Sequence, residues 1–192
     1  MDKTSYGFWM LIVVLFSASV FFGLNAEQRR RSFQSGAGKL ESGDLVKLVT
    51  AVDGDTVQVA LEGQEPVTVR LIGIKSFDAK VAKDPGTPFA KAALGELTDL
   101  MTRHPSRVML DATPKDKHGR YLATLFVEDR DIALHLLSRG LVVAYTVHPF
   151  PAMPIYLQAQ EKAEAARNGL WASAEATQRA RAMIETMRTQ SP

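Results

Sequence analysis

The sequence contains no cysteine, which excludes disulfide bonds, thiolate metal ligands and cysteine nucleophiles. It also lacks the HExxH, GxxxxGK and GxGxxG motifs of zinc peptidases, P-loop proteins and dinucleotide-binding folds. The chain also lacks a large excess of charge of either sign, because 23 basic residues nearly balance 21 acidic residues and leave a formal net charge of +2. Any binding of phosphate must therefore come from a local group of residues rather than from a basic surface.

One long apolar run lies near the N-terminus. Residues 6–24, YGFWMLIVVLFSASVFFGL, carry no charge, and a membrane-spanning helix needs about 20 such residues. A cleaved signal peptide is the alternative, but its apolar core usually has only about 7–15 residues. We therefore predict an uncleaved single-pass anchor in a membrane. Three arginines, residues 29–31, follow the run, and they predict that the soluble part faces the cytoplasm of a bacterium or the matrix of a mitochondrion.

The changes in composition divide the chain into five parts. Residues 1–5 form the N-terminal end, and the anchor covers residues 6–24. A stretch of polar residues and glycine at 25–43 predicts a linker. Residues 44–171 contain the patterned, folded part, and residues 172–192 predict a short C-terminal helical tail. If the anchor spans a membrane, we expect partner subunits there that contact its helix and the soluble part.

Hydrophobic patterning predicts a mainly β fold with helices. Alternation predicts five strands, at residues 44–52, 56–61, 67–74, 107–112 and 121–127. Helical spacing predicts three helices, at residues 89–104, 131–140 and 156–171. Three strands, a helix, two strands and two helices are the order expected of a five-stranded barrel of the OB type with helices packed outside it.

Five sequence blocks resemble the staphylococcal nuclease family, in order and with similar spacing. They are VDGDTV (52–57), VRLIGI (69–74), DKHGRYLATLFV (116–127), LSRGLVVAY (137–145) and AEAARNGLW (163–171). The resemblance covers about residues 44–171. It implies an OB-type barrel that carries a calcium-dependent phosphodiesterase, in which a water attacks the phosphorus of DNA or RNA.

The resemblance also assigns roles to single residues. Asp55 matches the first aspartate that binds calcium in the family. Arg70 and Arg120 match the two arginines that hold the phosphate, and a guanidinium suits this role because its planar fork donates two hydrogen bonds to one phosphate. Lys117 and Tyr145 match positions that contact the nucleotide phosphate and its surroundings.

One stretch departs from the family pattern. Lys75 stands where the resemblance implies the second calcium aspartate, and Ser76 stands where a backbone carbonyl binds the ion and could still do so. Phe77 replaces a proline. Asp78 takes the position of the glutamate that activates the water, with a side chain one methylene shorter. Val147 replaces a second tyrosine that contacts the nucleotide.

Lys75 decides what the resemblance can imply about chemistry. Calcium takes about six to eight oxygen ligands, and an ammonium about 5 Å from Ca²⁺ would be repelled by roughly 6–7 kcal/mol at an effective dielectric of 20. We therefore doubt a Ca²⁺ cofactor and expect no other. We predict instead that Lys75 pairs with Asp55 in the place of the lost cation. Arg70, Arg120 and Lys117 would then form an anion-binding cluster without hydrolysis.

Three functional interpretations follow, and a structural one competes with them. The first is an impaired nuclease that acts as an accessory or binding subunit of a membrane-associated assembly. The second is an active metal-dependent endonuclease with Arg70, Asp78 and Arg120 as catalytic groups, and the third is a binder of phosphate or nucleic acid without catalysis. The near-neutral net charge and Val147 weigh against the third, so nucleic acid is not the favoured partner. In the structural interpretation, DGDT is only a hairpin turn, and Arg70 and Arg120 only form ion pairs with Asp55 or Asp78.

Overall fold

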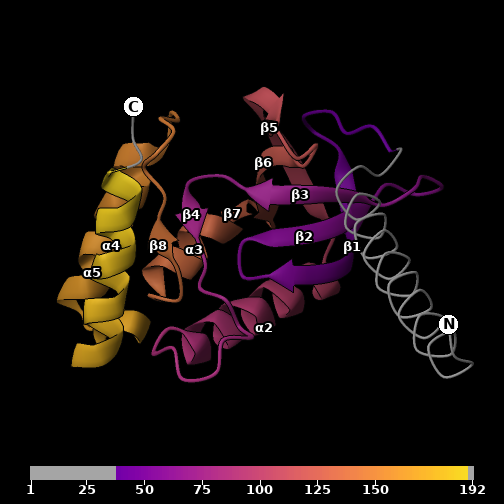
Figure 1. Ribbon diagram of the computed structural model, residues 1–192. Helices are drawn as coiled ribbons and strands as arrows, with labels where there is room; N and C mark the ends of the chain where they lie inside the picture. Colours follow the sequence, from indigo (N-terminus) through magenta and orange to yellow (C-terminus); the bar gives the residue numbers. More distant parts are fainter. Residues whose placement is uncertain (1–37, 190–192) are drawn as a thin grey trace, which may run out of the picture.

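A closed β-barrel forms the centre of the computed structural model, which describes residues 38–189 (Figure 1). Its strands are β1 (Leu45–Asp53), β2 (Thr56–Ala60), β3 (Val67–Leu71), β5 (Ser106–Lys115) and β6 (Tyr121–Val127). Strand β1 pairs with β2 and β5, β2 pairs with β3, and β5 pairs with β6, all antiparallel. A parallel pairing of β3 with β6 closes the ring. The predicted five-stranded barrel of the OB type is confirmed.

Three strands of two residues complete the β structure. Strand β7 (Arg130–Asp131) pairs antiparallel with the end of β6, and β4 (Ile74–Lys75) pairs with β8 (Val143–Ala144) in a small second sheet. The single strand predicted at 67–74 is therefore wrong in its extent, because the chain turns between β3 and β4. Gly73 makes this turn with a φ of +74°, and a Cβ atom there would lie 2.3 Å from the Phe150 ring.

The helices lie outside the barrel (Figure 1). They are α2 (Thr87–Arg103), α3 (Ile132–Ser138), α4 (Met153–Ala165), the 3₁₀ turn η1 (Gly169–Trp171) and α5 (Ala174–Arg188). The predicted helix at 156–171 has the wrong bounds, since α4 begins at Met153 and ends at Ala165. It ends there because Arg167 adopts a φ of +55° and Asn168 is extended, which interrupts the helical hydrogen bonds.

Two hydrophobic clusters hold these elements together. The larger cluster fills the barrel and the space under α2, α3 and α4. The smaller cluster joins the start of α2, strand β8, the end of α4, η1 and α5. Its buried members are Phe77, Ala90, Val143, Val147, Ala163, Leu170, Trp171, Ala176, Ala180 and Met187. Helix α5 therefore packs on the body of the domain with one apolar face.

The predicted membrane anchor at residues 6–24 lies outside the described residues, as does the linker up to residue 37. Between residues 38 and 189, none of the helices combines the length and the apolar character that a bilayer crossing requires. The anchor, its membrane and its orientation stay predictions.

Candidate functional site

The hairpin between β1 and β2 carries the DGDT motif and begins the site. Asp53 stabilises the turn, because its Oδ1 accepts a hydrogen bond of 2.8 Å from the Asp55 backbone N–H. Gly54 lies so close to the segment after β4 that a Cβ atom there would meet the Ser76 Oγ at 2.4 Å. This close approach brings Asp55 next to Lys75 and Ser76, which are far from it in the sequence.

Asp55 is the buried centre of the site, with only 1% of its surface exposed. Its Oδ1 accepts a hydrogen bond of 2.9 Å from the Thr56 hydroxyl and forms an ion pair with Arg70 Nη1. Its Oδ2 accepts a hydrogen bond of 2.7 Å from the Ser76 backbone N–H and lies 3.8 Å from Lys75 Nζ. A buried carboxylate stays charged only when such partners surround it. The predicted pairing of Lys75 with Asp55 is present.

Arg70, near the end of β3, is also buried, with 9% of its surface exposed. Besides its ion pair, it donates hydrogen bonds to the backbone oxygens of Asp55, at 3.3 Å, and Ile74, at 2.9 Å. Burial lowers the pKa of Arg70 to about 10, although the nearby charge of Asp53 opposes this. The guanidinium therefore remains charged at neutral pH, and contacts within the protein occupy much of its donor capacity.

Arg120 lies on the turn before β6 and has a different partner. Its Nε and Nη2 each lie 2.8 Å from Asp116 Oδ2. Asp116 Oδ1 accepts hydrogen bonds from the backbone N–H groups of His118 and Arg120, at 2.8 and 3.0 Å. Burial alone would raise the pKa of Asp116, but the hydrogen bonds from Arg120 and His118 outweigh it and lower this pKa. Arg70 therefore pairs with Asp55, as the structural interpretation predicts. The same interpretation is wrong for Arg120, which pairs with Asp116 and not with Asp55 or Asp78.

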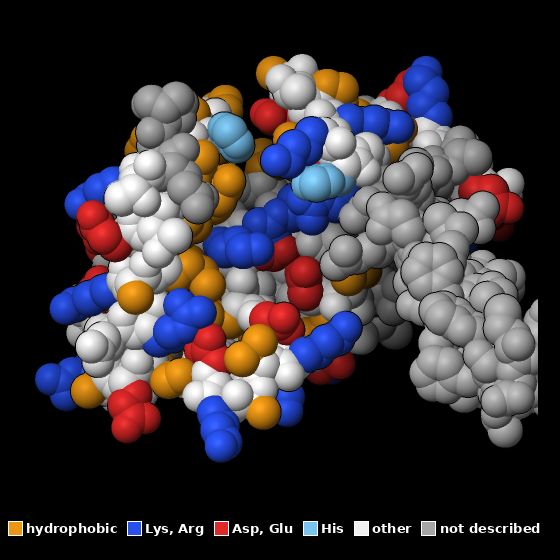
Figure 2. Space-filling model, viewed as in Figure 1, with side chains coloured by type: hydrophobic (Ala, Val, Ile, Leu, Met, Phe, Trp, Pro, Cys, Tyr) orange, Lys and Arg blue, Asp and Glu red, His pale blue; other side chains and the backbone are white. Residues whose placement is uncertain are grey.

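Strand pairing brings the cationic side chains together. The parallel register sets Val69 opposite Tyr121, so the turn with Arg120 lies beside the strand with Arg70. Lys75 and Arg70 lie beside the same Asp55 carboxylate. Burial and the charge of Arg70 lower the pKa of Lys75; Asp53 opposes this change, and Arg120 adds to it. Figure 2 shows a group of basic side chains between the ends of β3 and β4, with acidic side chains next to it. We call Arg70, Lys75 and Arg120 the cation cluster.

The remaining predicted site residues lie around this cluster. Ser76 is buried, and Lys117 is exposed on the turn that carries Arg120. Tyr145 is half-buried just after β8, where its backbone N–H donates to the Gly73 oxygen at 2.9 Å. Asp78 is exposed, and its Oδ1 accepts a hydrogen bond of 2.8 Å from the Lys80 backbone N–H. The Asp78 carboxylate therefore stabilises its own turn.

The residues of the site do not fit the Ca²⁺ ion that the resemblance implies. Calcium needs about six to eight oxygens, typically with several carboxylates. Within residues 38–189, no three or more His, Cys, Asp or Glu side chains are grouped so that they could hold a metal ion. The Asp55 carboxylate, which would be the first ligand, already has an arginine, a lysine, a hydroxyl and a backbone N–H around it.

The most important site residue that sequence reasoning missed is Asp116. A signal for it exists, since aspartate begins the DKHGR turn and aspartate often accepts hydrogen bonds from the backbone of its own turn.

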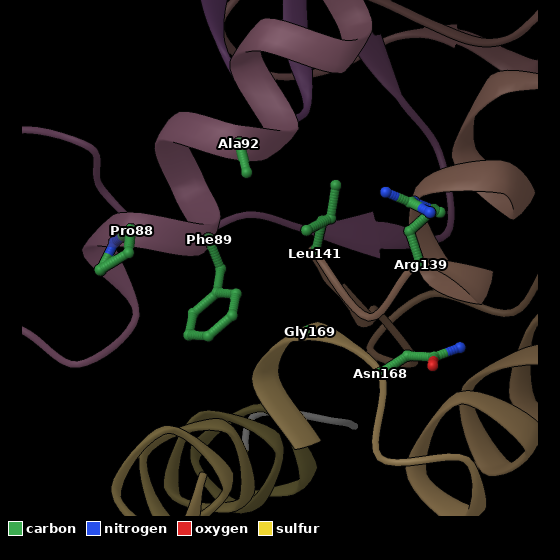
Figure 3. A pocket seen from close by; sticks show the side chains of 7 residues that line it. All are labelled: Pro88, Phe89, Ala92, Arg139, Leu141, Asn168 and Gly169. Atoms are coloured by element: carbon green, nitrogen blue, oxygen red, sulfur yellow. The ribbon is translucent and has the colours of Figure 1, made fainter. Parts of the chain in front are cut away.

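A groove elsewhere on the domain lies between α2, the segment after α3 and η1 (Figure 3). Its lining residues are Pro88, Phe89, Ala92, Arg139, Leu141, Asn168 and Gly169. Its one charged side chain is engaged, because Arg139 Nη2 lies 3.1 Å from a Glu96 oxygen, so the groove offers no second cation cluster.

Comparisons with known proteins agree with the motifs. A family described as staphylococcal nuclease homologue matches residues 68–173, from β3 to the residue before α5. The thermonuclease of Staphylococcus intermedius is 34% identical over 128 residues, which are 66% of this chain and 74% of that protein. An uncharacterized endonuclease of Haemophilus influenzae is 32% identical over 126 residues, 66% of this chain and 65% of that protein. Endonuclease YncB of Bacillus subtilis is 30% identical over 106 residues, 54% of this chain and 50% of that protein.

Proposed function

Because the chain belongs to the staphylococcal nuclease family, we propose that its domain binds the phosphates of a nucleic-acid strand and has lost calcium-dependent cleavage. One observation carries this proposal: the Lys75 ammonium lies 3.8 Å from the buried Asp55 carboxylate. A fixed positive charge at this distance neutralises the carboxylate and repels a divalent cation that would approach it.

Binding of phosphate rests on the exposed cations of the site. The Lys75 side chain is 44% exposed, so its ammonium can contact a ligand while it remains near Asp55. Arg120 is partly exposed, and Lys117 extends the positive charge along the same turn. A phosphodiester backbone would complement these three charges and displace counterions, which makes such binding depend on salt.

Loss of cleavage is supported by the state of the candidate base. Asp78 is exposed, and its carboxylate accepts a hydrogen bond from the Lys80 backbone N–H. General-base catalysis requires a carboxylate held accurately against the attacking water, and small errors of position are costly. The Asp78 side chain is one methylene shorter than glutamate, and its carboxylate is already hydrogen-bonded to the Lys80 backbone N–H. Both features argue against Asp78 as the general base.

A metal-dependent endonuclease is the second candidate. It is favoured by the names of the similar proteins, thermonuclease and endonuclease, and by the two arginines at the positions that hold phosphate in the family. In this alternative, Arg70, Arg120 and Asp78 are the catalytic groups. Asp55 and Ser76 would then bind a metal only after the Lys75 side chain moves away.

One experiment separates the two candidates. The full-length chain is purified in detergent and mixed with fluorescent single-stranded DNA or RNA in EDTA, Ca²⁺, Mg²⁺ or Mn²⁺. Anisotropy measures binding at several salt concentrations, and gels report the length of the oligonucleotide. We expect binding that weakens with salt, resists EDTA and leaves the strand intact. Cleavage in any of these metals that disappears in Arg70→Ala would replace the proposal with the endonuclease.

The wider setting is also a proposal. Anchored by residues 6–24, the domain would act as an accessory or binding subunit of an assembly at a membrane. Deletion of residues 6–24 should release the protein from sedimented membranes, and partner subunits should co-purify in fixed ratio with the intact chain only. If the intact chain and the chain without residues 6–24 sediment equally with the membranes, residues 6–24 are not the anchor.

A further inference from the structure

The segment 76–86, which joins β4 to α2, follows Lys75 directly and sets its position. Its first residue, Ser76, donates its backbone N–H to Asp55. Phe77 is buried, with 2% of its surface exposed. At the other end, the Thr87 hydroxyl donates to the Val81 oxygen at 2.6 Å and to the Asp78 oxygen at 3.2 Å. We call residues 76–86 the site segment.

One side chain of α5 contacts the site segment at two places. The Arg179 guanidinium lies 5.2 Å from the centroid of the Phe77 ring, within the range of a cation–π interaction. Its Nε donates a hydrogen bond of 2.9 Å to Asp84 Oδ2. Asp84 in turn accepts the Gly86 backbone N–H through Oδ1 at 2.8 Å. Arg179 therefore connects the start of the site segment to its end.

The apolar contacts of α5 reach the same place. Phe77 and Val147, the two apolar residues at positions where the family resemblance implies a proline and a tyrosine, are buried in one cluster with Ala176 and Ala180 of α5. The family match ends at residue 173, and α5 begins at Ala174. The departures at these two positions thus coincide with the surface that α5 covers.

We propose that Arg179 is a positioning residue, which holds the site segment from α5 and thereby keeps Lys75 and Ser76 against Asp55. The ion pair of Arg179 with Asp84 is partly exposed, with 38% and 15% of the two side chains accessible. Such pairs contribute little to global stability, and Phe77 is also buried among the other members of its cluster, so removal of Arg179 should loosen the segment and leave the barrel folded. The consequence for binding rests on the function proposed above, whereas the consequence for the segment does not.

The test compares Arg179→Ala with Arg181→Ala in the full-length chain. Arg181 is a matched control, because it lies on the same helix and pairs with Glu164 of α4 instead of the site segment. Hydrogen exchange followed by mass spectrometry should show peptides from 76–86 exchanging about tenfold faster in Arg179→Ala, as expected for local opening. Affinity for the fluorescent oligonucleotide should fall about threefold or more in that variant, since the cations lose their fixed arrangement. Arg181→Ala should change neither quantity, and Arg179→Lys should restore both in part.

Each outcome decides the inference. Unchanged exchange of 76–86 in Arg179→Ala would overturn it, and so would equal acceleration in both variants, because the effect would then be a general loosening of α5. Faster exchange with unchanged affinity would overturn the link to Lys75. If the unaltered chain binds no oligonucleotide, the proposed function fails, and the exchange data alone still decide whether Arg179 holds the segment.

Discussion

Arg70 on β3 and Arg120 on the turn before the neighbouring strand β6 lie close together in one barrel, yet different surroundings hold their guanidinium groups. Arg70 is 9% exposed and contacts the Asp55 carboxylate and two backbone oxygens. Arg120 lies on a turn with 28% of its side chain exposed and is held by Asp116 of the same turn. The first arrangement compensates a buried negative charge, and the second leaves a paired guanidinium partly exposed to solvent. Removal of Arg70 should therefore mainly lower the free energy of unfolding, and removal of Arg120 should mainly lower the affinity for the oligonucleotide.

The largest effect is expected for Arg70→Ala. Removal of one partner of a buried ion pair typically costs about 3–5 kcal/mol, and only Lys75, 3.8 Å away and partly exposed, would remain as a cation beside the buried Asp55 carboxylate. We expect the free energy of unfolding, measured by urea denaturation, to fall by about this amount. The double variant Arg70→Met, Asp55→Asn should recover part of the loss. A fall of less than about 1 kcal/mol, the value of a surface pair, would show that Arg70 is not a buried counterion.

Arg120→Ala should change binding far more than stability. Loss of a hydrogen bond to a charged group costs about 1.5–3 kcal/mol, which corresponds to about 10- to 140-fold in affinity. The slope of log affinity against log salt should fall by about 1, as for the loss of one phosphate contact. Arg107→Ala is the control, because Arg107 forms a surface pair with Asp129 outside the cation cluster. If the two variants bind alike, Arg120 does not contact the phosphate.

Lys75→Asp should convert the cation cluster into a calcium site. The change replaces the ammonium beside Asp55 by a second carboxylate, and Ca²⁺ that binds only the folded chain at about 100 times its Kd adds about 2.7 kcal/mol. We expect the melting temperature of this variant to rise with Ca²⁺, and that of the unaltered chain to stay constant. Lys117→Asp makes the same change of charge on the exposed turn. A similar rise in that control would mean that the effect is nonspecific.

The smallest effect concerns acid stability and compares Asp116 with Asp131. The pKa of Asp116 is lowered, so its stabilising contribution is complete above the ordinary 3.8 and disappears as pH falls through the folded value. Burial raises the pKa of Asp131, despite hydrogen bonds from Leu134 and Tyr156, so its contribution decreases as pH rises above 3.8. The melting temperature should be measured from about pH 3 to 6. Compared with the unaltered chain, it should fall less steeply toward acid pH in Asp116→Asn and rise more steeply with pH in Asp131→Asn. Parallel curves for both variants and the unaltered chain would contradict these directions.

The barrel could be predicted from the sequence because its signals are local and repeated. Strand β6, for example, alternates between buried and half-buried residues along its whole length, and the predicted bounds 121–127 agree with the structure. The pairing of Lys75 with Asp55 could also be predicted, since a lysine at the position of an aspartate must find a new arrangement beside the carboxylate that remains.

The rest depended on geometry that a sequence pattern does not contain. Helix α4 was predicted to run too far, because the positive φ of Arg167 carries no composition signal. Asp116 became the partner of Arg120 through the closure of a turn. The contact between Arg179 and Asp84 joins residues 95 positions apart, and only the packing of α5 on the second cluster brings them together.

A calorimetric titration of the full-length chain with Ca²⁺ tests the central claim most directly, namely that fixed cations occupy the place of the metal. Lys75 and Arg70 surround the Asp55 carboxylate, so we predict no binding heat above that of dilution. The Lys75→Asp variant, measured in the same way, should give a saturable heat. Tight Ca²⁺ binding by the unaltered chain that disappears in Asp55→Asn would contradict the account.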